Sequence, residues 1–264
     1  MQPKIFYSWQ TDCPQHINKQ FISEAIQEAI TSSPNFSIEP ALRVDSGMDD
    51  VPGSPEVARI MFDKISSSAI FIADVSLVGN STTNSQNVKK LANPNVLIEM
   101  GFAASAIGWE RILCVMNESF GTRHEQPFDI RNRRFPIDYK LPPDATPAQI
   151  NKEKNSLVKI LKDAIPGVLA YQNELVIKAK KRLDVNSLNV MYNFGKNGLD
   201  FFSDPHQNAW VTGGAMDSNR FHNGISRLLD LGLIFTEVKK GVATYSYFWT
   251  YLGVEVLKEL GIRS

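Results

Sequence analysis

The sequence has few of the residues that build disulfide frameworks, metal centres or membrane spans. Two cysteines occur among 264 residues, which is too few for a disulfide framework or a cysteine metal site. The four histidines are scattered, so their spacing assembles neither a metal site nor a Ser-His-Asp triad. No apolar run approaches the roughly 20 residues that a bilayer-spanning helix needs. We therefore expect no metal and no membrane span, and a reducing cytoplasm as the compartment.

An excess of charge of either sign is also lacking. Lysine and arginine together number 28, and aspartate and glutamate together also number 28, so no overall field attracts nucleic acid or anionic lipid. The glycine-rich motifs GxxxxGK[ST] and GxGxxG do not follow any of the apolar runs, which argues against a P-loop enzyme. We therefore expect no membrane partner, no nucleic-acid partner and no bound cofactor.

What the sequence does contain is a regular alternation of strand and helix patterns. Short apolar runs predict strands that are covered on both faces, and segments with helical spacing of apolar residues follow them. The predicted strands are 4–9, 36–44, 69–75, 111–116 and 134–139, and the predicted helices are 17–30, 54–65, 93–107 and 146–165. Pro40 suits an edge strand. The order predicts an α/β domain with a doubly wound, mostly parallel sheet.

The pattern changes after Pro166-Gly167, which we take as the domain boundary although residues 168–182 have the pattern of a helical linker. Beyond it, helices are predicted at 186–194, 219–231 and 250–260, with strands at 233–238 and 243–248 around Lys239-Lys240. The sequence thus predicts a larger domain at 1–165 and a smaller helical or winged-helix-like domain at 166–264.

Candidate site residues follow three of the predicted strands. Open parallel sheets bind ligands where the carboxyl ends of their strands meet. The loop from Ser8-Trp9 follows the first strand, Asp74 ends the third, and Asn93-Pro94-Asn95 opens the helix that carries Glu99. If Asn95 caps this helix, Glu99 lies one turn inside it among apolar residues, where burial raises the pKa of a carboxylate unless a donor meets it.

Each of these residues also has a purely structural interpretation. Glu99 could be a helix glutamate that compensates the dipole or forms a surface ion pair. Asp74 could cap a turn after its strand, and Trp9 could be a core or rim aromatic. The coincidence of the three loops at one edge of the sheet favours the functional interpretation, which centres a binding site on Glu99.

Five segments between Lys4 and Tyr139 resemble bacterial TIR-like proteins, which belong to a wider flavodoxin-like group that includes the nucleoside deoxyribosyltransferases. The segments are KIFYSWQTD, VPGSPEVARIMFDKI, AIFIADVS, NPNVLIEMGFAASAIGWERILCVMN and FDIRNRRFPIDY, and NPNVLIEMG with FIADVS is the most specific part. The resemblance implies a flavodoxin-like (TIR-like) sheet. It also implies an enzyme that cleaves an N-glycosidic bond, with NAD as substrate and Glu99 as the catalytic carboxylate.

The same resemblance assigns the other residues to nucleotide binding. Asp74 contacts ribose or orders the loop, Ser8 and Trp9 line the dinucleotide or base side, and Asn93 and Asn95 lie at the helix entrance. Such enzymes act as bacterial anti-phage defence effectors that assemble through the TIR-like domain. The resemblance therefore also implies a homo-oligomer, with the C-terminal domain as a sensor or assembly module that meets a regulatory partner or ligand.

Three alternatives remain open. A deoxyribosyltransferase-like enzyme would use the same glutamate to attack a sugar. A non-catalytic signalling module would bind a small nucleotide, with Glu99 holding a ribose. A DNA-binding regulator would use the C-terminal segment, where Arg220, Arg227, Lys239 and Lys240 are the available cations, although so few cations make a weak nucleic-acid surface.

Overall fold

The chain divides into two compact units, Met1–Leu169 and Ala170–Ser264, and each is considered by itself. The computed structural model describes residues 4–32, 39–42, 54–81, 88–131, 136–196, 198–199, 201–203, 217–237 and 246–263. The predicted Lys239-Lys240 turn lies outside the described residues.

A five-stranded parallel sheet forms the centre of the first unit. Its strand order is β2-β1-β3-β6-β7, and every neighbouring pair is parallel. The central strands β1 and β3 are almost wholly buried because their apolar runs are covered on both faces. Pro40 lies in β2 at the edge of the sheet, as predicted, since a proline cannot donate to a central ladder. The strands are β1 (Lys4–Ser8), β2 (Glu39–Leu42), β3 (Ile70–Asp74), β6 (Ile112–Asn117) and β7 (Ile137–Tyr139).

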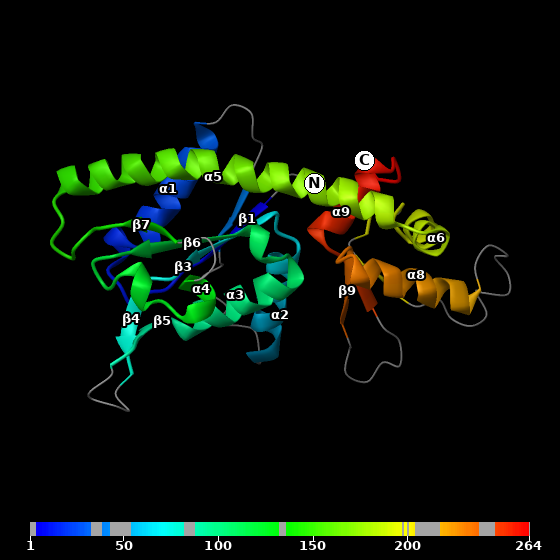
Figure 1. Cartoon of the computed structure of the whole chain (residues 1–264), viewed down its shortest axis with the longest axis horizontal. Coiled ribbons are helices and arrows are strands. Elements are labelled where there is room, and N and C mark those ends of the chain that lie inside the picture. Colours follow the sequence, from blue (N-terminus) through cyan, green and yellow to red (C-terminus); the bar gives the residue numbers. More distant parts are fainter. Residues whose placement is uncertain are drawn as a thin grey trace. The chain divides into compact units, whose positions relative to one another are not determined.

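Helices cover both faces of this sheet, which confirms the predicted α/β class and its doubly wound arrangement (Figure 1). On one face lie α1 (Lys19–Thr31) and α5 (Pro147–Arg182), and on the other lie α2 (Ser54–Ser66) and α3 (Pro94–Ala106). The α2 and α3 side encloses an apolar cluster in which the rings of Phe6 and Phe71 stack. Burial of such side chains is the main stabilising term for the domain.

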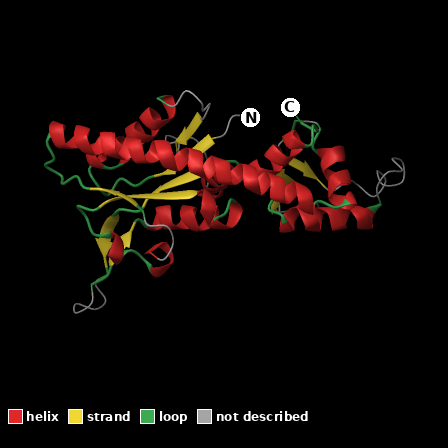
Figure 2. Cartoon of the chain, turned by 45° about the horizontal axis from the view of Figure 1, so that its top comes forward, coloured by secondary structure: helices red, strands yellow, loops and turns green. Residues whose placement is uncertain are grey.

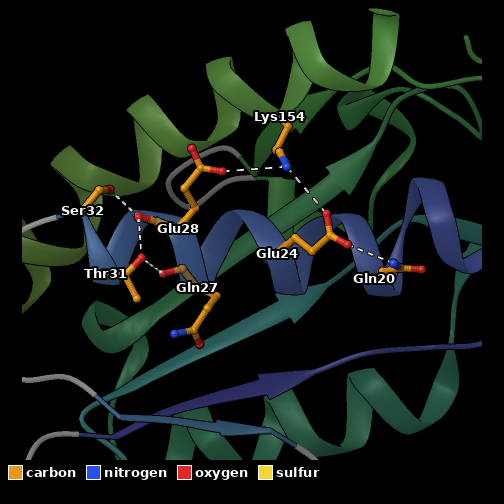
Figure 3. Close-up of polar contacts among 7 residues, drawn as sticks. All are labelled: Gln20, Glu24, Gln27, Glu28, Thr31, Ser32 and Lys154. Atoms are coloured by element: carbon orange, nitrogen blue, oxygen red, sulfur yellow. Dashed lines mark hydrogen bonds and ion pairs between the residues drawn. The ribbon is translucent and has the colours of Figure 1, made fainter. Parts of the chain in front are cut away.

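Polar contacts join α1 to α5 at the surface (Figure 3). Lys154 Nζ lies 3.7 Å from Glu24 Oε2 and 3.8 Å from Glu28 Oε2. Near the end of α1, the hydroxyl groups of Thr31 and Ser32 bond to backbone carbonyls of the last turn. Exposed pairs of this kind contribute at most about 1 kcal/mol, so the apolar faces hold the two helices together.

The structure adds elements that the sequence patterns did not indicate. The polar stretch after β3 contains an antiparallel hairpin of β4 (Leu77–Asn80) and β5 (Lys90–Ala92). A short helix, α4 (Phe128–Arg131), precedes β7. The predicted helix end at Ile165 is wrong, because α5 continues through Pro166 to Arg182. A proline costs one backbone hydrogen bond, and the apolar stripe of α5 continues beyond it at Val168, Val176 and Ala179.

The second unit combines helices with a small antiparallel sheet (Figure 2). The sheet order is β8-β10-β9, and β8 was not predicted. An aromatic-rich core fills the unit, with Phe202 close to both Tyr247 and Trp249. The elements are α6 (Val185–Phe194), β8 (Phe201–Ser203), α8 (Ser218–Asp230), β9 (Ile234–Glu237), β10 (Ser246–Trp249) and α9 (Tyr251–Glu259).

The close crossing of α6 and α8 gives a testable prediction. A Cβ atom on Gly224 would lie 2.7 Å from Asn186 O and 2.7 Å from Val190 Cγ2. We expect Gly224→Ala to lower the free energy of unfolding by about 1 to 3 kcal/mol, because backbone on the facing helix must move. In the matched control Gly101→Ala, nothing beyond the neighbouring residues and the backbone of its own helix lies within 4 Å of the new methyl group, so its helix should gain about 0.5 to 1 kcal/mol. Urea unfolding measures the free energy of unfolding of both variants. Equal changes in the two would contradict the close packing of α6 against α8 at Gly224.

Candidate functional site

The carboxyl ends of β1, β3 and β6 meet at one edge of the sheet, and they end in Ser8, Asp74 and Asn117. From β1 the chain crosses through α1 to β2 on one side, and from β3 it crosses through α3 to β6 on the other. The order of the strands therefore reverses between β1 and β3. Ligands of open α/β sheets bind at such a reversal, so this edge is the candidate site.

Glu99 and Ser8 meet at this edge. Side chains of a strand alternate between the two faces of a sheet, so Ser8 points to the same side as Phe6, toward α3. Its Oγ donates a hydrogen bond of 2.6 Å to Glu99 Oε2. Glu99 is 2% exposed and lies on the buried stripe of α3 with Val96 and Met100. The structure thus brings two predicted site residues together and buries the glutamate, as the sequence predicted.

Asn93 caps α3. Its Oδ1 accepts hydrogen bonds from the backbone N–H groups of Asn95 at 2.9 Å and Val96 at 3.4 Å. The expectation that Asn95 caps the helix is therefore wrong. Pro94 occupies the first helical position, where its fixed φ and missing N–H are tolerated, and this moves the cap to the residue before it. Asn95 is exposed in the first turn.

Two further contacts surround the loop after β1. Asn93 Nδ2 donates a hydrogen bond of 2.6 Å to Asp12 Oδ2, which joins this loop to the beginning of α3. Lys19 Nζ lies 3.4 Å from the centroid of the Trp9 ring, a cation–π contact, and Trp9 is 7% exposed. Trp9 thus lies buried next to the positive charge at the beginning of α1.

Asp74 faces the side of the sheet opposite to Ser8 and Glu99. Side chains alternate along β3, so Asp74 points to the same side as Ile72, whereas Ala73 points toward α3. Its carboxylate is fully buried and accepts hydrogen bonds from four donor groups. Ser76 donates to Oδ1 from its backbone N–H at 3.0 Å and from its hydroxyl at 2.6 Å. Gln10 Nε2 donates to Oδ2 at 3.1 Å, and Asn18 Nδ2 donates to Oδ2 at 3.2 Å.

These contacts separate the roles predicted for Asp74. The carboxylate is engaged by the chain itself and lies on the other face from Glu99. The structure therefore does not bring Asp74 together with Glu99, and its contacts favour the loop-ordering role over a ribose contact.

Sequence reasoning missed most of this buried network. Asn117 Nδ2 donates to Leu141 O at 2.8 Å and to Asn18 Oδ1 at 3.2 Å, and its backbone N–H donates to Ser76 Oγ at 2.9 Å. Gln10 Oε1 accepts from the backbone N–H of Cys13 at 3.0 Å. The one available signal was a polar residue at the end of each apolar strand.

Burial shifts the ionisation of this network. It raises the pKa of Asp74 above its ordinary 3.8, although the donors from Ser76, Asn18 and Gln10 act to lower it. Burial and then the charge of Asp74 raise the pKa of Tyr7 well above 10.0. The pKa of the Cys13 thiol rises to about 11, again mainly through burial. The network therefore keeps both Tyr7 and Cys13 protonated at neutral pH.

Other predicted features were compared with the described residues. Within them, no group of three or more His, Cys, Asp or Glu side chains is placed to hold a metal ion. None of their helices is long and apolar enough to cross a membrane. In α8, Arg220 pairs with Asp217 at 3.5 Å and Arg227 Nε donates to Arg182 O at 3.0 Å, so two of the four candidate cations for nucleic acid contact protein groups.

No family model matches the chain, and no curated protein matches it. The site must therefore be interpreted from its own chemistry.

The network around Asp74 gives a stability prediction. Every neighbour of the carboxylate donates, so Asp74→Asn places an N–H group against other donors. We expect the free energy of unfolding to fall by about 1 to 3 kcal/mol near pH 7. Asp144→Asn, an exposed aspartate in a loop, serves as the control and should change little.

The raised pKa adds a pH dependence to this prediction. Between 3.8 and the folded-state pKa of Asp74, the native state binds more protons than the unfolded chain, so the free energy of unfolding of wild type falls as the pH rises. The variant lacks this titration. The free energy of unfolding of wild type should therefore exceed that of Asp74→Asn by less and less as the pH rises above 3.8. An excess that grows with pH would contradict the raised pKa.

Proposed function

We propose that the chain is a TIR-like NAD glycohydrolase that cleaves the bond between nicotinamide and ribose. The observation that carries the proposal is the buried Glu99 carboxylate, which Ser8 Oγ holds at 2.6 Å beside the reversal of strand order. Open α/β sheets bind ligands in the crevice at the carboxyl ends of the strands, beside a reversal of strand order. In the proposal, the carboxylate of Glu99 meets the ribose of the substrate at this edge.

The strand order supports a flavodoxin-like, TIR-like domain. Counted within the sheet alone, the order β2-β1-β3-β6-β7 reads 2-1-3-4-5, which is the flavodoxin-like order. In that arrangement the ligand lies between the first and third strands. The resemblance of the segments from Lys4 to Tyr139 to TIR-like proteins leads to the same position for a nucleotide.

The chemistry suits a site with one carboxylate and no histidine. The bond between C1′ of the ribose and the pyridinium nitrogen breaks, and its electron pair stays on the nitrogen, so nicotinamide leaves as a neutral molecule. Positive charge grows on the ribose, and the carboxylate of Glu99 stabilises it. Water then adds to C1′ and loses a proton, which gives ADP-ribose and nicotinamide. No acid is needed for the leaving group.

The remaining site residues have positioning roles in this proposal. Ser8 fixes the orientation of Glu99, and Trp9 lines the base side of the dinucleotide with Lys19 against its ring. Asn93 and Asn95, at the beginning of α3, lie next to the nucleotide. Asp74 orders the loop through Gln10.

The wider biological role is part of the proposal. A TIR-like domain of this kind acts in the cytoplasm as an anti-phage defence effector, and it assembles with other copies through the same domain. The second unit, with three antiparallel strands and helices α6 and α8, is proposed to be a winged-helix-like sensor or assembly module. It would meet the regulatory partner or ligand.

A second candidate function is a non-catalytic nucleotide-binding module. The bond from Ser8 Oγ to Glu99 supports it, because a carboxylate that accepts from one hydroxyl can also accept from a ribose hydroxyl without any turnover. In this case the glutamate only holds a ribose hydroxyl. A deoxyribosyltransferase-like enzyme would instead transfer a deoxyribose to a new base, and product analysis with deoxynucleosides separates it from a hydrolase.

The direct test compares nicotinamide release from NAD by concentrated wild-type protein and by Glu99→Gln, with and without a crowding agent that promotes assembly. We expect release by wild type and a loss of at least about 100-fold in the variant, because the amide has no charge to stabilise the ribose cation. Glu110→Gln, which changes an exposed glutamate, is the matched control and should keep full activity.

Two results would contradict the glycohydrolase. Equal release by wild type and Glu99→Gln would remove Glu99 from the reaction. No release by assembled wild type, together with nucleotide binding that Glu99→Gln weakens, would establish the binding module instead.

A further inference from the structure

The loop from Ser8 to Cys13 lies along the first two turns of α3. Ser8 contacts Glu99 in the second turn, and Asp12 contacts Asn93 at the cap. Glu99 and Asn93 are six residues apart, which is about 9 Å along the axis of a helix. Ser8, at the end of β1, and Asp12 are thus bonded to the two ends of this stretch, so the chain between them runs next to the beginning of α3.

The carboxylate of Glu99 is closed off from solvent. Ser8 is fully buried, Trp9 is 7% exposed and Glu99 is 2% exposed, whereas Ile98 beside it on α3 is 61% exposed. A ribose must contact the Glu99 carboxylate directly in the proposed reaction. It therefore reaches this group only after some part of the covering chain moves.

Two sets of contacts hold the loop, and they differ in their exposure to water. The inner set is buried, with Gln10 Nε2 bonded to Asp74 and Gln10 Oε1 bonded to the backbone N–H of Cys13. The outer contact is the 2.6 Å bond from Asn93 Nδ2 to Asp12 Oδ2, at the surface. Water competes for the surface groups and not for the buried ones, so the outer contact opens first.

We propose that the Asp12–Asn93 hydrogen bond is a latch that keeps the Ser8–Cys13 loop closed over Glu99 and so restrains the activity of the site. This regulatory role rests on the proposed function, but the closure itself does not. Release of the latch lets the loop move away from the cap of α3 and admits the nucleotide. Any partner that takes hold of Asp12 or Asn93 would activate the site.

Two cysteines report on the closure without any need for activity. Cys13 lies at the end of the loop and is 3% exposed, so a reagent reaches it only when the loop opens. Cys114 lies in β6 of the same unit, where its Sγ contacts Met100 of α3, and serves as the internal reference for a general loss of stability. These are the only cysteines in the chain.

The test measures the rate at which N-ethylmaleimide modifies each cysteine in the full-length chain, by mass spectrometry of the peptides. We expect Asp12→Ala to speed the modification of Cys13 about fivefold, the change in open population that the loss of one ordinary hydrogen bond gives. The rate at Cys114 should stay the same.

Asp12→Asn is the matched control, because its Oδ1 still accepts from Asn93 while the charge is lost. The charge of Asp12 also raises the pKa of Cys13, and both variants remove that effect equally. The difference between them therefore measures the hydrogen bond alone. In Asn93→Asp, a carboxylate still caps α3 but repels Asp12, so this variant should also speed the modification of Cys13.

Several outcomes would overturn the latch. One is a Cys13 rate in Asp12→Ala equal to that in Asp12→Asn, and another is an equal rise at Cys13 and Cys114, which reports a general loss of stability. Nicotinamide release is measured in parallel. If release occurs but does not rise in Asp12→Ala, the latch does not regulate the site. If Cys13 reacts faster and no variant releases nicotinamide, the closure stands and the glycohydrolase fails.

Discussion

The buried carboxylate of Asp74 is the constraint on which the arrangement of the site depends. A charge without water is tolerated only where donors surround it, and here the donors come from three segments. Gln10 comes from the loop after β1, Asn18 from the beginning of α1, and Ser76 from the chain after β3. Because all three must converge on one group, the path of the loop after β1 is set. That path decides where Trp9 lies against Lys19 of α1 and where Asp12 meets the cap of α3.

The pleat of the sheet places the two acids on opposite faces. Tyr7 and Asp74 face α1, and Ser8 faces α3 and Glu99. The carboxylate of Asp74 accepts hydrogen bonds from four donor groups, and that of Glu99 accepts one from Ser8. The acid at the end of β3 and the acid on α3 therefore have different neighbours, although both lie near the same edge of the sheet. This arrangement also makes the loop both the support of Glu99 and the cover over it, so that access and positioning depend on the same few contacts.

Much of the fold could be predicted from the sequence, since the apolar runs of β1 and β3 and the helical spacing of α1 and α3 are strong local signals. The burial of Glu99 followed from its apolar neighbours. The helix cap was placed wrongly because Pro94 decides it, and α5 was ended too early because a proline was given more weight than the apolar stripe beyond it. The network of Gln10, Asn18 and Asn117 joins residues far apart in the chain, and no local pattern contains such information.

The central claim is that Glu99 meets the ribose of a dinucleotide after the loop opens. The most direct measurement is a crystal structure of the full-length protein with a non-hydrolysable NAD analogue. The account predicts that the ribose on the nicotinamide side hydrogen-bonds to the Glu99 carboxylate, with the Asp12–Asn93 bond broken and the loop displaced from α3. An analogue bound elsewhere, with the loop closed and Glu99 still covered, would contradict it.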